Sequence, residues 1–359
     1  MNDTIVAIAL SGGVDSLVSG LLIKKKFKNV FGIHFTTGYE KTSINAKVLE
    51  NQLGFPVYIV DLSQIFETQV VQYFISTYLK GKTPNPCVIC NQKIKFNALW
   101  EKARALGANA IATGHYATIV NSLSFPEKKI SQPFLAKGID PVKDQSYFLS
   151  MLTPKQLERV IFPLAGFTKS QVKNLAEENN LTPLTPSESQ DICFIHDKDF
   201  SQFIIKKKGL SPKSGNIIDL HGKKVGIHRG LHTFTIGQRR GINCPASEPY
   251  YVRHIDLSTN TLVVCFKKDL VQNQMQVDKI IWNYPFINKI DKSNGIKKAK
   301  ENLKVITKIR YSHKGAASRL TFDNNLCNVI FDEPQSAVTP GQAAVFYKND
   351  RVLGAGIIK

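Results

Sequence analysis

The chain has 359 residues, of which 43% are hydrophobic and 21% are charged, so it is a folded protein of two or three domains rather than a disordered or fibrous one. Its net charge of +19 favours a polyanionic partner, either nucleic acid or an anionic membrane surface. No apolar run reaches the roughly 18 residues of a membrane span. Six cysteines without a secretory signal indicate reduced thiols in a cytoplasmic protein.

The positive charge is concentrated in the second half of the chain. Residues 1–200 contain 21 basic and 17 acidic side chains, whereas residues 201–359 contain 26 basic and 11 acidic ones. A lysine-rich composition by itself would spread the charge evenly. The asymmetry therefore predicts that the second half attracts most of the polyanion.

The first half alternates apolar runs with helical periodicity, which indicates a doubly wound α/β domain. We expect strands at 5–10, 30–35, 57–60 and 110–113, and helices at 16–26, 44–53, 63–79 and 94–106. Residues 145–180 are predicted to be helical with a break near Phe162, and 181–190 to form a proline-bounded loop.

Beyond residue 200 the pattern changes to short β-like runs separated by Gly, Asn and Asp, with one helix near 198–208. The strands are expected at 217–220, 250–255, 261–266, 303–311, 327–331, 343–347 and 352–358. This half is therefore predicted to be mostly β and to divide into two small units near residue 270.

Ser11-Gly-Gly-Val-Asp-Ser16 lies between the first strand and the first helix. Its glycines allow close backbone approach, and the free N–H groups at the helix start form an anion cradle with the serine hydroxyls. It is not a Walker A loop, which ends in Gly-Lys-Ser/Thr. It resembles the pyrophosphate loop of enzymes that cleave ATP to AMP and pyrophosphate.

Cys87 and Cys90 form a Cys-x-x-Cys pair between Pro84 and the helix predicted to start at Ile94. The pair could be half a zinc site, a redox pair or two buried thiols. Because a thiol near a helix N-terminus has a lowered pKa, we expect a thiol that is nucleophilic at neutral pH.

Three further stretches carry polar chemistry. A lone Cys193 follows the proline-bounded loop in the stretch 187–194, and a mobile, reachable thiol is one interpretation of it. Thr113-Gly-His-Tyr116 follows the fourth strand, at the sheet edge where doubly wound folds bind ligands. The stretch 143–148 opens a helix, where polar groups could serve as caps or as nucleic-acid contacts.

Taken together, these motifs resemble the tRNA-specific 2-thiouridylase family, which thiolates the wobble uridine of certain tRNAs. The matching stretches run in order along the whole chain: ALSGGVDS (9–16), GKTPNPCVICNQKIKF (81–96), ATGHYA (112–117), KDQSYFL (143–149), SQDICF (189–194), TIGQRRG (235–241), KIRYS (308–312) and AVTPGQAAVFY (337–347). The resemblance implies an ATP pyrophosphatase domain at 1–199, a central tRNA-binding domain at 200–270 and a C-terminal β-barrel at 271–359.

The resemblance also implies roles for individual residues. The ATP site is expected to consist of Ala9, Leu10, Ser11, Gly12, Gly13, Val14, Asp15, Ser16, Phe35 and Gly114. Asn85, Pro86 and Cys87 are expected to approach the target base. The tRNA contacts are expected at His115, Lys143, Asp144, Gln145, Arg310, Tyr311 and Gln342. Cys90 matches the nucleophile and Cys193 the persulfide carrier.

The chain departs from the family pattern in two places. Residues 35–43 lack the Lys-Asn-Trp and the acidic insert that usually follow the second strand, which bears on the adenine side of the site. Cys87 stands where some members carry an aspartate proposed as a base.

The family chemistry requires ATP and Mg²⁺, tRNA and a protein that donates persulfide sulfur. Adenylation would turn the uridine C2 oxygen into a leaving group, and a persulfide on Cys193 would supply sulfur, with a Cys90–Cys193 disulfide to be reduced afterwards. An iron–sulfur cluster on Cys87, Cys90 and Cys193 is a second route to the same product.

Two functions compete with thiolation. A lysidine-synthetase-like enzyme would need the pyrophosphate loop but not the cysteines. A non-catalytic RNA-binding protein with a degenerate nucleotide site would need neither, and the intact loop and the three thiols argue against it.

Overall fold

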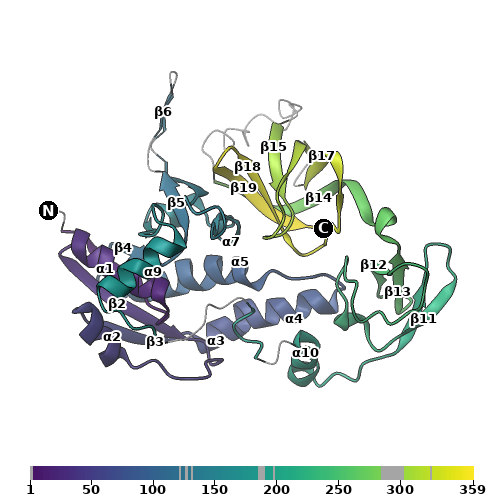
Figure 1. The fold of residues 1–359 in the computed structure, drawn as a ribbon, viewed down its shortest axis with the longest axis horizontal. Coiled ribbons are helices and arrows are strands. Elements are labelled where there is room, and N and C mark those ends of the chain that lie inside the picture. The colour runs from purple at the N-terminus through teal and green to yellow at the C-terminus, as the bar shows by residue number, and fades with distance from the viewer. Residues whose placement is uncertain are drawn as a thin grey trace.

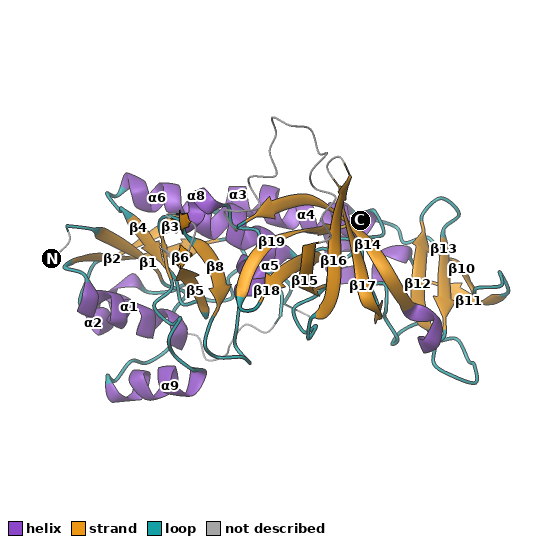
Figure 2. Ribbon diagram, turned by 90° about the horizontal axis from the view of Figure 1, so that it is seen from above, coloured by secondary structure: helices purple, strands orange, loops and turns teal. Residues whose placement is uncertain are grey.

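The computed structural model describes residues 3–120, 123–125, 128–130, 132–184, 191–196, 199–283, 303–323 and 326–359. An α/β body comes first in the chain, followed by a small sheet and then a barrel (Figure 1). Seen from above, the barrel lies between the α/β body and the small sheet (Figure 2). The expected fold, a parallel α/β sheet followed by two β units, is confirmed. None of the helices in these ranges is long and apolar enough to cross a membrane.

The N-terminal sheet has five parallel strands in the order β3-β2-β1-β4-β9. They are β1 (Ile5–Ala9), β2 (Asn29–Thr36), β3 (Val57–Asp61), β4 (Ala110–Ala112) and β9 (Val160–Ile161). The chain order reverses at β1, whose neighbours are β2 and β4. In such sheets the carboxyl ends of the strands at this reversal form the ligand-binding edge.

Alternation along β1 divides the core into two layers. Val6 and Ile8 contact a buried cluster with α1 (Val14–Lys26), α2 (Ala46–Leu53) and α9 (Lys169–Glu178). Ala7 belongs to the cluster on the other face, which is covered by the helices between β3 and β4. A strand buried on both faces explains the continuous apolar run.

Two of the predicted helices differ from expectation in their details. The segment 63–79 is continuous but comprises α3 (Ser63–Phe66), a π-helical turn (Glu67–Val71) and α4 (Gln72–Leu79). The segment predicted at 94–106 begins earlier, with α5 (Pro86–Cys90), a π-helical stretch (Asn91–Ala98) and α6 (Leu99–Ala105). Pro86 occupies the first turn, where its missing N–H costs nothing, and the Asn85 side chain caps the Val88 N–H at 3.3 Å.

The segment 145–180 is less helical than predicted. It contains α7 (Ser146–Leu149), α8 (Pro154–Leu157), the short strand β9 and then α9. A strand of two residues is too short to show a period in the sequence, so no pattern predicts β9. Of the loop predicted at 181–190, residues 185–190 lie outside the described residues.

A hairpin that the sequence pattern does not predict links the α/β body to the barrel. It consists of β5 (Ala117–Val120) and β8 (Phe134–Lys137), with β6 (Leu123–Phe125) and β7 (Lys128–Ile130) between them. Strand β8 pairs with a barrel strand through Ala136 and Arg351. The hairpin therefore extends the barrel sheet into the first domain.

The C-terminal unit is a closed antiparallel barrel of six strands in the order β14-β17-β16-β15-β18-β19, with β19 pairing back to β14. They are β14 (Val271–Trp282), β15 (Leu303–Lys308), β16 (Ala316–Asp323), β17 (Leu326–Ser336), β18 (Ala343–Lys348) and β19 (Arg351–Ile358). Alternate residues fill its interior, among them Val277, Leu320 and Phe346. Closure leaves these six strands without a free sheet edge.

The central unit is a four-stranded sheet in the order β11-β10-β13-β12, preceded by the helix α10 (Phe200–Lys208). Its strands are β10 (Gly215–Ile218), β11 (Lys224–His228), β12 (Tyr251–Asp256) and β13 (Thr261–Cys265). It has its own small core around Ile217, Val252 and Leu262.

Candidate active site

The pyrophosphate loop occupies the expected turn between β1 and α1. Gly12 has a φ of +79°, a conformation that favours glycine. Gly13 is the N-cap of α1 and has no side chain to cover the helix N–H groups. The Ser16 hydroxyl instead closes the turn, donating to the Gly13 carbonyl at 2.8 Å and accepting from the Ser11 N–H at 3.2 Å. This leaves a cradle that fits a polyphosphate.

Gly114, in the loop that follows β4, lies directly against this loop. A Cβ at this position would lie 2.9 Å from the carbonyl carbon and oxygen of Asp15 and 3.1 Å from the Ser16 nitrogen. Only glycine fits there without displacing the backbone. The loop after β4 and the pyrophosphate loop therefore form one surface.

Asp15 is held by two residues for which the sequence predicts no such role. The Lys169 ammonium lies 2.7 and 2.8 Å from its two carboxylate oxygens, and the Tyr116 hydroxyl donates to Oδ1 at 2.6 Å. Lys169 is the first residue of α9, whose Thr168 and Gln171 form a capping box. Basic residues are unfavourable at the start of a helix, so a lysine there is the sequence signal that could have identified Lys169 as a site residue.

His34 and Phe35 lie at the end of β2, where the sequence predicts the adenine. His34 Nδ1 is 2.7 Å from the Leu10 carbonyl, so Nδ1 carries the proton. Its Nε2 is buried and has no hydrogen-bond partner within the described ranges. Phe35 follows it and packs against the core. These residues and the cradle fit a purine nucleoside triphosphate, and Mg²⁺ bound with it would neutralise phosphate charge, since Lys169 already engages Asp15.

Cys87 and Cys90 lie within the first turns of α5 and not on a loop before it. Cys90 is half-buried, whereas Cys87 and Cys193 are exposed. Burial raises the pKa of Cys90 to about 12 and that of Cys193 to about 11. The expectation of a lowered pKa at the helix N-terminus is therefore wrong in this conformation, because desolvation outweighs the helix dipole. Water screens this penalty more strongly at the exposed Cys193 than at Cys90.

Lys95, for which the sequence likewise predicts no role, is the cation shared by the thiol region. Its charge lowers the pKa of all three thiols, in each case against a larger burial effect. It follows Cys90 by five residues, and the π-helical stretch with its i→i+5 bonds favours placing such residues on one face. In an α-helix they would be about 140° apart.

His115 connects the thiol region to the pyrophosphate loop. Its Nε2 lies 3.5 Å from the Lys95 ammonium, and its Nδ1 lies 2.7 Å from the Thr113 hydroxyl. Because an ammonium can only donate, Nε2 is the acceptor and the ring is neutral. Burial, followed by the Lys95 charge, holds the pKa of His115 well below its usual value. Contacts thus run from the loop through Gly114 and His115 to Lys95.

The structure brings several expected tRNA residues together beside this region. The Tyr311 ring stacks on Phe148 at 4.5 Å, next to the segment 143–145. Gln145 bonds the Tyr116 backbone through its N–H at 2.8 Å and its side-chain oxygen at 3.0 Å. Asp144 is buried and accepts from the Gly138 and Ser146 N–H groups. Arg310 donates to the Ser336 carbonyl at 3.3 Å.

Thr83 joins all three units just before the cysteine helix. Its N–H donates to the Pro340 carbonyl at 2.8 Å, and its hydroxyl donates to that of Thr235 in the central unit at 3.1 Å. The Gln342 amide donates to the carbonyls of Thr83 and Pro84 at 3.2 and 3.0 Å. The barrel and the central unit therefore both hold the segment that leads into residues 85–87.

A cavity of about 470 Å³ opens in the central unit. It is lined by Arg239 and Arg240 from the stretch TIGQRRG and by Tyr250. Tyr250 stacks on Phe266 with ring centroids 5.0 Å apart and an interplanar angle of 8°. Two guanidinium groups beside an aromatic face suit a phosphate with an adjacent base.

An iron–sulfur cluster would need three thiolates gathered around one centre. Among the residues that are described, no three His, Cys, Asp or Glu side chains are arranged to hold a metal ion. The present arrangement of Cys87, Cys90 and Cys193 therefore does not support the iron–sulfur route. Residues 187–190, which begin the motif that ends beside Cys193, lie outside the described residues.

Comparison with known proteins covers the whole chain. Residues 4–197 match a family model described as a tRNA methyl transferase HUP domain, 201–266 a tRNA methyl transferase PRC-barrel domain, and 273–358 an aminomethyltransferase beta-barrel domain. The chain is 43% identical over 361 residues to the tRNA-specific 2-thiouridylase MnmA of Desulfosudis oleivorans, covering 100% of this chain and 96% of the relative. It is 41% identical to MnmA 2 of Thermoanaerobacter pseudethanolicus, with 99% and 97% covered. Identity to MnmA of Desulfotalea psychrophila is 39%, with both chains fully covered.

Proposed function

This chain belongs to the tRNA-specific 2-thiouridylase family, and on that basis we propose that it catalyses the ATP-dependent 2-thiolation of uridine 34 in tRNA. The observation that carries the proposal is the run of contacts from the pyrophosphate loop through Gly114 and His115 to Lys95 and the thiols. An enzyme that only cleaves ATP would not need thiols at this place.

The first step is adenylation of the target base. The uridine C2 oxygen attacks the α-phosphorus of ATP, and pyrophosphate leaves into the cradle formed by residues 11–16. The α1 N–H groups stabilise the charge that develops on the leaving group, and the Ser16 hydroxyl holds the turn that presents them. Lys169 neutralises Asp15, so that the carboxylate does not repel the phosphates. Mg²⁺ on the triphosphate would supply further neutralisation.

The second step replaces the activated oxygen with sulfur. A donor protein loads Cys193 as a persulfide, Cys193–S–SH. The Cys90 thiolate attacks the Sγ atom of Cys193 itself, which breaks the bond from Sγ to the outer sulfur, forms the Cys90–Cys193 disulfide and releases that outer sulfur as HS⁻. Sulfide adds to C2, AMP leaves and 2-thiouridine remains. An external dithiol then reduces the disulfide to two thiols.

The tRNA is proposed to lie across all three units. His115, Lys143 and Gln145 of the first unit and Arg310 and Tyr311 of the barrel surround the target nucleotide, which meets residues 85–87. The cavity at Arg239 and Arg240 would hold a phosphate of a more distant part of the tRNA. In this structure Gln342 and Asp144 make internal hydrogen bonds, so their part is to hold the loops that touch RNA.

The direct test is to incubate the purified chain with ATP, Mg²⁺, a persulfide donor and tRNA bearing an unmodified wobble uridine. Mass analysis of the digested tRNA should show 2-thiouridine together with AMP and pyrophosphate. Ser16→Ala should abolish both products, and Cys193→Ser should abolish thiouridine. AMP formation without any sulfur incorporation by the wild-type chain would refute the proposal.

A further inference from the structure

The segment after β2, where the chain departs from its family pattern, forms a closed turn. The Glu40 carboxylate accepts from the Thr37 N–H at 2.6 Å, the Thr37 hydroxyl at 2.7 Å and the Gly38 N–H at 3.1 Å. Gly38 has a φ of +81°, which the turn requires. The turn is therefore fixed internally, and it presents the Tyr39 side chain from the end of β2, the adenine side of the site.

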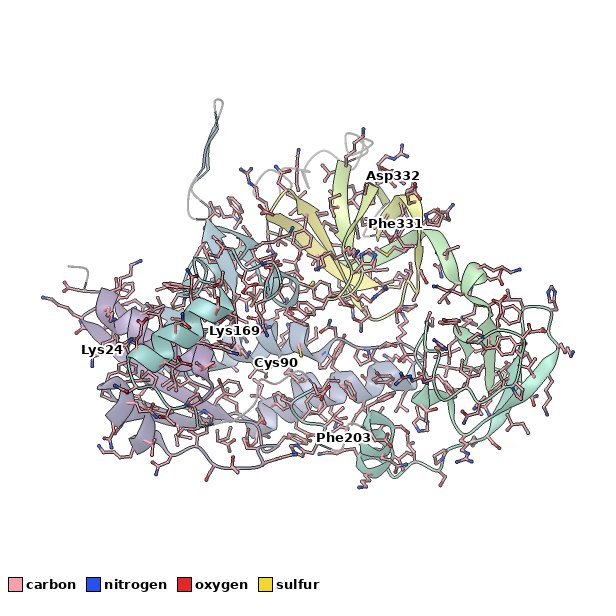
Figure 3. All side chains as sticks on the ribbon, in the orientation of Figure 1. Lys24, Cys90, Lys169, Phe203, Phe331 and Asp332 are labelled. Atoms are coloured by element: carbon pink, nitrogen blue, oxygen red, sulfur yellow. The ribbon has the colours of Figure 1, made fainter. Side chains whose placement is uncertain are left out.

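Tyr39 enters a cluster of aromatic rings, which we call the Phe194 cluster. Its ring centroid lies 5.9 Å from that of Phe194, 6.0 Å from that of Phe66 and 6.1 Å from that of Phe203. Phe203 belongs to α10, in the lower part of the molecule, and Cys90 to the helix above it (Figure 3). The Phe194 cluster thus joins the nucleotide side of the first unit to α10.

Phe194 is the centre of the cluster. It is only 2% exposed, and its ring lies 5.3 Å from Phe74, 5.4 Å from Phe203 and 5.7 Å from Phe66, in addition to Tyr39. Its neighbour in the chain, Cys193, is exposed. A buried anchor next to an exposed thiol fixes where that thiol can reach.

The polar edge of Tyr39 is fixed as well. Its hydroxyl donates to the Glu67 carboxylate, which also pairs with the Lys207 ammonium at 3.2 Å. The same ammonium lies 5.1 Å from the centroid of the Tyr39 ring.

We propose that Tyr39 is a positioning residue for Cys193: through its contact with Phe194 it holds the sulfur-carrying residue within reach of Cys90. The importance of this contact rests on the proposed function, in which sulfur passes between these two residues. The contact also gives a role to the divergent segment after β2, since the residue that anchors the sulfur carrier comes from the edge where adenine is expected.

The experiment measures how readily Cys90 and Cys193 meet. The full chain is equilibrated in glutathione buffers, in which oxidised glutathione takes two electrons from the two thiols and leaves a disulfide and two reduced glutathione molecules. Peptide mass analysis then measures how much of the Cys90–Cys193 disulfide has formed, and this amount gives the effective concentration of Cys193 at Cys90. Tyr39→Ala should lower it about tenfold, equal to about 1.4 kcal/mol, whereas Tyr39→Phe keeps the ring and should stay near wild type.

The control is Tyr58→Ala. Tyr58 is an exposed tyrosine of β3 whose ring contacts Phe31 at 5.5 Å, outside the Phe194 cluster. It should leave the effective concentration unchanged. If Tyr39→Ala fails to fold, Phe203→Leu tests the same anchor from α10 and should give a similar fall.

Two results would overturn the proposal. One is an unchanged effective concentration in Tyr39→Ala, including the case in which the wild-type disulfide never closes. The other is an equal fall in Tyr58→Ala. The assay contains neither tRNA nor ATP, so a chain that does not thiolate tRNA but shows the expected fall refutes the proposed function and not this inference.

Discussion

Lys169 and Asp15 are 154 residues apart in the sequence, yet the ammonium of one lies within 2.8 Å of both carboxylate oxygens of the other. The pair joins α9, on which Figure 3 labels Lys169, to the first turn of α1, at the mouth of the pyrophosphate loop. Lys169 is nearly buried, with a side-chain exposure of 11%. Its charge is therefore weakly screened where the phosphates of ATP would bind.

Loss of this lysine should weaken the use of ATP. Lys169→Met leaves the Asp15 carboxylate unneutralised beside the triphosphate, so kcat/KM for ATP should fall at least about tenfold, or about 1.4 kcal/mol. The affinity for tRNA should not change. AMP release measures the first quantity and filter binding the second. Lys173→Met is the matched control, since Lys173 is exposed on the same helix, and an equal loss in that variant would contradict the assignment.

The two parts of this site differ in how far the sequence predicts them. The cradle is local, because residues 11–16 are consecutive and follow an apolar strand, so the pattern predicts both its place and its chemistry. Lys169 and Lys95 reach the site only through tertiary packing and the π-helical stretch, for which no spacing rule exists. The sequence does not predict the strands β5 and β8 for a related reason. Strand β8 pairs with β19, which belongs to the barrel, so the pairing does not depend on the local sequence alone.

The boundary of the cysteine helix is a further example. The polar stretch and Pro84 suggest a loop up to residue 93, but the Asn85 cap and Pro86 allow the helix to begin there. The expected thiol pKa is wrong for a different reason, because the local pattern does not show how deeply a thiol is buried in the folded chain. The junction at Thr83 likewise depends on Gln342, which lies 259 residues away.

The cavity at Arg239 and Arg240 leads to a prediction about salt. Each phosphate that a protein neutralises releases counterions, so tRNA affinity should fall steeply as salt rises. The double variant Arg239→Gln/Arg240→Gln should bind more weakly and reduce the slope of log Kd against log salt by about 2. Arg319→Gln is the control, because Arg319 on the barrel already pairs with Asp332 at 3.5 Å. An unchanged slope in the double variant would mean that the cavity does not hold phosphate.

The environment of Cys90 predicts a pH dependence. Because burial raises the pKa of Cys90 to about 12, only a small fraction is thiolate near neutral pH, and that fraction rises about tenfold per pH unit. Alkylation of Cys90 by iodoacetamide, followed at the peptide level, should therefore rise steadily from pH 7 to about 9.

The same assay isolates the contribution of Lys95. Lys95→Met removes the cation that lowers the pKa of Cys90, so the rate should fall by a constant factor at every pH in this range, and Lys95→Arg should restore much of it. Lys93→Met is the control because Lys93 is exposed on the same helical stretch. A plateau in the wild-type rate below pH 8 would show that Cys90 is better hydrated than the structure indicates.

The thiols themselves provide the last prediction. Cys90 and Cys193 should each be essential for forming 2-thiouridine, while neither is needed for ATP to bind. Cys193→Ser cannot carry a persulfide, so AMP should be released without sulfur incorporation. Cys90→Ser should still load persulfide on Cys193 but fail to pass it on. Mass analysis of the intact protein detects the persulfide, and mass analysis of digested tRNA detects 2-thiouridine, so together they distinguish the two variants.

The other four cysteines are the internal comparison. Cys265 and Cys327 are buried in the β units, so their alanine variants should lose some stability but keep sulfur transfer, and Cys244→Ala should do the same at the edge of the central cavity. Cys87 is exposed at the start of the helix, and Cys87→Ala should slow the reaction without stopping it, since the persulfide route uses only Cys90 and Cys193. Full sulfur transfer by Cys193→Ser would refute that route, and complete loss in Cys87→Ala would show that a third thiol takes part in the chemistry.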